Sequence, residues 1–190
     1  MERRDLLRAA GVATALSFLG SPRDAAVIWA RLARGGAVRD GLSEAQLALV
    51  AAIADTILPR SDTPSATDVG VPAFVDVVVS ENYTDVDRVA FVAGLDAIEA
   101  RAKTAGGDAF AQLAPSARAT VIESIEGEQS RRADPARTYW RLKGLIVHGY
   151  FTSEPVMKDV LKYEVMPGRF EGSAPMPIRP SAPSGGHRHA

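Results

Sequence analysis

Apolar residues between positions 43 and 59 recur at the three- and four-residue spacing of an α-helix: Leu47, Val50, Ala51, Ala54, Ile57 and Leu58. A capping box precedes them, because the Ser43 side chain can accept the Gln46 N–H while the Gln46 side chain reaches back to the Ser43 N–H. Pro59 lacks a backbone N–H and ends the helix. The pattern therefore predicts a helix that starts after Ser43 and ends at Pro59.

A second helix is predicted after a turn-rich loop that spans residues 60–71. Pro72 suits the first turn of a helix, where no intrahelical N–H bond is lost. The apolar stripe that follows consists of Phe74, Val75, Val78 and Val79. The β-branched run at 77–79 would also suit a strand. We favour the helix because the apolar spacing is helical and capping residues flank the segment.

Capping residues and helical apolar spacing predict two more helices. Thr84 with Asp87 caps the third helix, which stops at Gly106 and Gly107. Its apolar positions are Val89, Val92, Leu95, Ile98 and Ala102. A short turn leads to Pro115, which opens a fourth helix with the apolar positions Val121, Ile122 and Ile125.

The fifth helix is predicted to start at Asp134 as the cap, with Pro135 in the first turn. Its apolar stripe consists of Tyr139, Leu142, Leu145, Ile146 and Gly149. A short helix restarts at residues 153–155 and reaches about Leu161. No stretch alternates apolar and polar residues as a strand does. The sequence therefore predicts an all-α protein, a single irregular bundle of about five to six helices over residues 42–172.

The two ends of the chain differ from this bundle. Paired arginines and two leucines open the chain: Arg3, Arg4, Leu6 and Leu7. A short, mildly apolar stretch follows at 9–20, and the whole resembles a twin-arginine (Tat) export signal. We expect residues 1–34 to be a signal segment and linker, and residues 173–190, rich in Pro, Gly, Ser and His, to be a disordered tail.

The signal segment leaves alternatives open. It could instead be an amphipathic helical N-terminus of a cytoplasmic protein. As a signal, it could be cleaved at Ala25-Ala26 or retained as an uncleaved anchor, because residues 25–33 continue with helical spacing.

Composition excludes several classes of function. The net charge of −1 provides no basic field that would attract nucleic acid. The chain has no cysteine, which excludes disulfides, thiolate zinc sites, cysteine-ligated iron–sulfur clusters and cysteine catalysis. No apolar run reaches the roughly 20 residues that a membrane-spanning helix needs. A transmembrane anchor would therefore require retention of the signal segment.

Candidate catalytic chemistry is sparse. His148 follows an apolar run and is expected to be buried or to cap a helix, and His187 and His189 lie in the tail, where they offer at most a weak metal site. No glycine-rich loop follows a strand, so neither a phosphate-binding nor a dinucleotide-binding fingerprint is present. Asp55 and Asp76 interrupt apolar stripes and could pair with an arginine or face a partner protein.

Aromatic residues gather in the final third of a chain whose aromatic content is only 6%: Tyr139, Trp140, Tyr150, Phe151, Tyr163 and Phe170. Composition alone favours a core role for such a cluster. An interface with another protein is the alternative, because Tyr, Trp and Phe are enriched there.

Two blocks of the sequence resemble the gluconate 2-dehydrogenase subunit 3 family. The first block comprises residues 53–59, 63–66 and 69–76. The second comprises residues 142–145 and 149–154 and closes with Tyr163 and residues 167–172. The resemblance extends over about residues 42–172, and a Tat-like N-terminus is usual in that family. The chain departs from the family at Pro64-Ser65, where Pro-Gly is common, and in its long tail.

The resemblance implies the non-catalytic small subunit of a periplasmic dehydrogenase complex that oxidises CH–OH groups of gluconate, glucose or glucosides. In such complexes a large subunit of the glucose–methanol–choline (GMC) type binds FAD and performs the oxidation. Electrons pass to a cytochrome c subunit or another acceptor that is not NAD. The small subunit escorts the large one through the Tat translocase, and the complex is expected to be membrane-associated.

By the same resemblance, this chain is expected to hold no catalytic, cofactor-binding or metal-binding residue, because FAD belongs to the partner. The matched positions that the resemblance places at the partner interface are Tyr150, Phe151, Tyr163, Pro167, Gly168, Arg169 and Phe170. A free-standing periplasmic helical binding protein is the alternative function, and it would need an apolar pocket.

Overall fold

The computed structural model describes residues 22–35, 41–128 and 132–163, and every regular element in these ranges is helical. The α-helices are α2 (Pro22–Ala33), α3 (Glu44–Ile57), α4 (Val71–Asn82), α5 (Asp85–Gly106), α6 (Pro115–Glu126) and α7 (Ala136–Thr152). Two short turns complete the described part, the 3-10 turn η1 (Phe110–Gln112) and the π-helical turn η2 (Val156–Val160). The prediction of an all-α bundle is confirmed.

The helix ends are largely set by the capping residues that the sequence offers. Before α3, Ser43 Oγ accepts the Gln46 N–H while the Gln46 side chain accepts the Ser43 N–H, so the predicted capping box is formed. Before α5, Thr84 Oγ1 accepts the Asp87 N–H. Gly107 ends α5 with a φ of 80°, a left-handed conformation that glycine adopts without strain.

Residues 77–79 are helical and do not form a strand. They lie in the middle of α4, which contacts α2, α3 and α7, and all three valines are buried. Neighbours on several sides bury most of the helix surface, so a β-branched run is accommodated despite its modest helix propensity. The helical alternative is therefore correct.

The start of α7 differs from the prediction by one residue. Pro135 occupies the cap position and makes no side-chain cap hydrogen bond, so Asp134 is not the cap residue. Asp134 Oδ1 instead accepts hydrogen bonds from the Thr138 N–H, at 3.3 Å, and from Thr138 Oγ1, at 2.6 Å. The carboxylate still satisfies an N–H of the first turn, but it acts from one residue further upstream.

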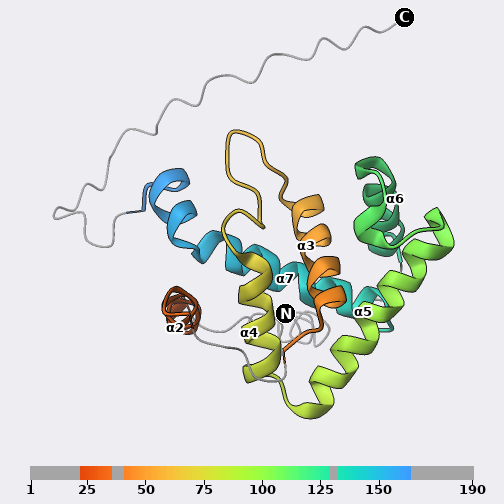
Figure 1. Ribbon diagram of the computed structural model, residues 1–190, viewed down its shortest axis with the longest axis horizontal. Coiled ribbons are helices and arrows are strands. Elements are labelled where there is room, and N and C mark those ends of the chain that lie inside the picture. Colours follow the sequence, from red (N-terminus) through yellow and green to blue (C-terminus); the bar gives the residue numbers. More distant parts are fainter. Residues whose placement is uncertain (1–21, 36–40, 129–131, 164–190) are drawn as a thin grey trace, which may run out of the picture.

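Helix α7 is the centre of the bundle. It contacts α2, α3, α4, α5, α6 and η2, and Figure 1 shows it passing behind α3 and α4. Gly149 lets α4 approach closely, because a Cβ at this position would lie 2.8 Å from the Phe74 ring. The largest fully buried side chains come from all parts of the bundle and include Phe74, Phe91, Phe110, Tyr139 and Ile146. This core fixes the position of the last turn of α7.

Candidate partner-docking site

The two blocks on which the family resemblance rests meet at one end of the molecule. The first block covers the end of α3, much of the loop of residues 58–70 and the start of α4, and the described part of the second covers the second half of α7 and the residues on either side of the turn η2. They are joined by the Tyr150 hydroxyl, which donates a hydrogen bond of 2.8 Å to the Pro64 carbonyl oxygen. We call the loop 58–70 together with residues 151–163 the docking end.

The carboxylate of Asp55 holds the loop from the end of α3. Its Oδ1 accepts the Thr67 N–H at 2.9 Å, and its Oδ2 accepts the Thr67 hydroxyl at 2.7 Å. Asp76 has a comparable role on α4, where its Oδ1 accepts the Leu42 N–H at 2.6 Å. The expectation that these two aspartates pair with an arginine or face a partner is therefore corrected, because both bind backbone N–H groups of this chain.

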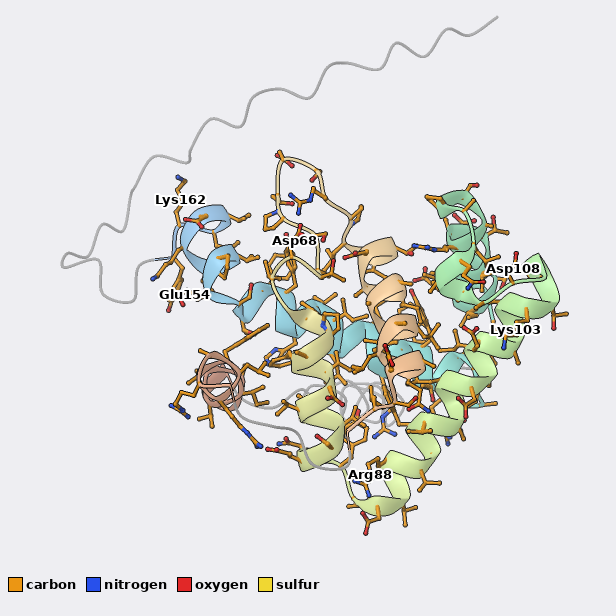
Figure 2. All side chains as sticks on the ribbon, in the orientation of Figure 1. Asp68, Arg88, Lys103, Asp108, Glu154 and Lys162 are labelled. Atoms are coloured by element: carbon orange, nitrogen blue, oxygen red, sulfur yellow. The ribbon has the colours of Figure 1, made fainter. Side chains whose placement is uncertain are left out.

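A second carboxylate, that of Asp68, braces the loop from within. Asp68 Oδ2 accepts the Ser65 N–H at 2.8 Å, and Oδ1 pairs with the Arg60 guanidinium. Figure 2 shows Asp68 within the loop. The Ser65 N–H is the main reason that the pKa of Asp68 is below its usual value, and Arg60 lowers it further. The loop is therefore held in one conformation by its own hydrogen bonds.

Exposed apolar side chains occur along residues 151–163. Phe151 is 43% exposed, Leu161 48% and Tyr163 57%, and they are three of the six large hydrophobic residues exposed in the described part of the chain. Phe151 lies on α7, and backbone hydrogen bonds hold the other two after the turn η2, because the Leu161 N–H donates to the Val156 carbonyl and the Tyr163 N–H to the Met157 carbonyl. Exposed apolar groups on hydrogen-bonded backbone are typical of a protein interface.

Tyr150 does not share this exposure. Its side chain is only 4% exposed and its ring packs edge-on against Phe151, with 5.3 Å between centroids. Tyr150, which the resemblance placed at the partner interface beside Phe151, therefore does not present its ring to a partner, because α7 turns by about 100° per residue and neighbouring side chains point to different faces. The other predicted interface and export residues lie outside the described residues: Arg3, Arg4, Leu6, Leu7, Pro167, Gly168, Arg169 and Phe170.

An apolar groove runs along the outer face of α7 and reaches the docking end at Phe151. It is lined by Trp140, Lys143, Gly144, Val147, His148, Phe151 and Thr152. These positions repeat every three or four residues, so the sequence carried a signal for this second apolar face, which the predicted core stripe of α7 did not include. Burial lowers the pKa of His148 below its usual value, and its ring lies 6.0 Å from that of Phe74.

Neither a metal-binding group nor a membrane-spanning helix occurs among the described residues. Within residues 22–35, 41–128 and 132–163, no group of three or more His, Asp or Glu side chains could hold a metal ion. The long helices of the same ranges are also too polar to cross a bilayer. Two glutamates at the end of α6 and just after it bind within the chain: Glu126 accepts a hydrogen bond from Lys143, and Glu128 pairs with Arg101.

Comparison with known proteins assigns the family. The family model for gluconate 2-dehydrogenase subunit 3 matches residues 44–168, which is more than half of the chain and includes α3 through η2. Neither the curated proteins nor the solved structures gave a match to this chain. The matched region contains both parts of the docking end and the bond that joins them. The chain therefore belongs to the gluconate 2-dehydrogenase subunit 3 family.

Proposed function

We propose that this chain is the non-catalytic small subunit of a periplasmic dehydrogenase complex. The complex oxidises CH–OH groups of a sugar or sugar acid, such as gluconate, glucose or a glucoside. A GMC-type large subunit holds the FAD, and a cytochrome c or another acceptor that is not NAD takes the electrons. Family membership supports the proposal, because the family is named for a subunit of such an enzyme.

The observation that carries the proposal is the convergence of the two family-like blocks on one end of the molecule. Tyr150 and Pro64 are joined across 86 positions of sequence, the exposed Phe151 ring packs against Tyr150, and the exposed Tyr163 follows the turn η2. Burying one such ring against a partner would contribute roughly 1.5–3 kcal/mol to binding. We propose that the large subunit binds at this docking end, with Phe151 and Tyr163 as apolar anchors.

The N-terminal sequence adds export to this role. Arg3 and Arg4, followed by a mildly apolar stretch, support passage through the Tat translocase, which carries folded proteins. We propose that the subunit supports maturation of the flavoprotein, escorts it to the periplasm and stabilises it there. The complex would then be membrane-associated through its other subunits.

Isolation of the native complex through an affinity tag on this subunit tests the proposal. The expected preparation is yellow, contains FAD and reduces a dye in the presence of a sugar or sugar acid. The paired substitution Phe151→Ser and Tyr163→Ser should lower the amount of co-purified flavin by a factor of about ten or more, since 1.4 kcal/mol corresponds to tenfold in affinity.

Val86→Ser is the matched control. Val86 is 80% exposed and begins α5, near Arg88, which Figure 2 places at the opposite end of the molecule from Asp68. This variant should retain the full amount of flavin. Equal amounts of flavin in the two variant preparations, from variants that fold normally, would show that the docking end is not the interface. A colourless wild-type preparation would contradict the proposed function itself.

A further inference from the structure

Helix α2 belongs to the folded bundle although it lies upstream of the family-matched region. The match begins at residue 44, whereas α2 comprises residues 22–33. Its inner face is buried, with Ala25 at 1% exposure and Ile28 at the edge of the core. Figure 1 shows α2 end-on beside α4, and it contacts both α4 and α7.

Trp29 is the main contact between α2 and the bundle. Its indole stacks on the Phe74 ring at 5.2 Å between centroids with an interplanar angle of 25°. Its Nε1–H donates a hydrogen bond of 3.2 Å to Thr152 Oγ1 at the end of α7. One side chain therefore joins α2 to the two helices that carry the family-like blocks.

The outer face of α2 is polar or exposed, as expected for a helix packed on a surface. Val27 is 65% exposed, and Arg31 pairs with Glu81 at the far end of α4. The opposite, inner face carries Ala25, Ile28 and Trp29 at helical spacing. An amphipathic helix with a matched ion pair at its end is positioned specifically against the bundle.

We infer that α2 is a permanent helix of the folded subunit, and that any removal of an export leader ends before Pro22. The second part rests on the proposed export. Leader removal is hydrolysis, in which water adds across one peptide bond to give a new carboxylate and a new amino group. Peptidases act on exposed, locally unfolded chain, whereas the Ala25-Ala26 bond lies within α2 and Ala25 is buried. Cleavage there would require α2 to leave the bundle.

Mass spectrometry of the subunit purified from the periplasm tests the position of the N-terminus. The inference requires that the first residue is Pro22 or an earlier one. A first residue at Arg23 or beyond would overturn it. Absence of the subunit from the periplasm would count against the proposed export alone. The docking of α2 is tested separately by hydrogen–deuterium exchange, which does not require export.

Hydrogen–deuterium exchange of the full-length wild-type protein tests whether α2 is docked. The amides of α2 should be protected to a degree similar to those of α4. Exchange of α2 at the rate of unfolded chain, with α4 still protected, would overturn the inference. This measurement needs no substitution and is therefore unaffected by a variant that fails to fold.

Substitutions at Trp29 provide a graded test in the same full-length protein. Trp29→Ala should lower Tm by about 5–10 °C, because it removes a large ring from a packed contact. Trp29→Phe keeps an aromatic ring against Phe74 but loses the bond to Thr152, so its Tm should fall by less. Val27→Ala, on the exposed face of α2, is the control and should leave Tm unchanged. Equal Tm values for all four proteins would contradict a docked α2.

Discussion

The hydroxyl of Tyr150, at the end of α7, donates a hydrogen bond of 2.8 Å to the carbonyl oxygen of Pro64, in the loop between α3 and α4. The two residues are 86 positions apart in sequence, and they belong to the two blocks on which the family resemblance rests, both within the matched residues 44–168. Tyr150 is buried where it makes this bond, whereas its neighbour Phe151, on another face of α7, is exposed. Tyr150 secures the shape of the docking end, and Phe151 remains available for a partner.

Replacement of Tyr150 by Phe should weaken the attachment of the loop without removing the ring from the core. The loss of one hydrogen bond is expected to lower the free energy of unfolding by about 0.5–1.5 kcal/mol. Hydrogen–deuterium exchange should become faster in residues 58–70, and denaturant unfolding should give the change in stability. Tyr163→Phe is the control, since Tyr163 is exposed and should change neither quantity. Unchanged exchange in the loop of the Tyr150 variant would show that this bond does not hold it.

Gly94→Ala should destabilise the protein, although alanine is the better helix former by about 1 kcal/mol. A Cβ at this position of α5 would lie 1.9 Å from Thr138 Oγ1 and 2.9 Å from Asp134 Oδ1, so the start of α7 would have to move. The expected loss is about 1–3 kcal/mol, measured by thermal or denaturant unfolding. In a Thr138→Ala background the same substitution should cost less, because the nearest atom is gone. Equal costs in both backgrounds would contradict a direct contact.

His148 should make the stability of the protein depend on pH just below neutrality. Burial lowers the pKa of His148, so the unfolded chain, with a pKa of about 6.5, binds its proton first as the pH falls. The stability that is linked to neutral His148 is therefore fully present above a pH of about 6.5. It is lost as the pH falls from there toward the lower pKa of His148 in the folded state. His148→Gln should flatten this part of the stability profile. The difference between the wild-type and His148→Gln profiles of stability against pH removes the contribution of the other titrating groups. Parallel profiles would contradict the assignment of this pH dependence to His148.

Substitution of Arg3 and Arg4 by Lys should abolish export, because the twin-arginine signal is read by its paired guanidinium groups. Cell fractionation should then find the subunit, and any flavoprotein that it escorts, in the cytoplasm. Arg8→Lys is the matched control and should leave the distribution unchanged. A periplasmic Arg3, Arg4 variant would show that another route is used.

The sequence by itself determined the helices and most of their ends. The Ser43–Gln46 and Thr84–Asp87 pairs lie three residues apart, and Gly107 acts through its own φ, so these signals are local and can be identified without knowledge of the fold. The apolar periodicity also identified the core faces of α4, α6 and α7. On α3 and α5 the predicted stripes were partly wrong, because they omitted the buried Leu49, Ile53 and Phe91 and included Val89, which is 67% exposed. Among the helix ends, the exception was Asp134, which supplies its carboxylate from one residue before the cap position.

Only the tertiary structure decided the partners of the polar and aromatic residues. Asp55 binds Thr67, Asp76 binds Leu42, and Trp29 spans α2, α4 and α7. These partners lie from 12 to 123 positions away in sequence, so no local pattern names them. A helical stripe shows that a residue is apolar and which neighbours share its face, but its burial depends on which other helix covers that face. For that reason the sequence predicted an aromatic cluster near the end of α7, while the packing alone separated the buried Tyr150 from the exposed Phe151 and joined α2 to the bundle.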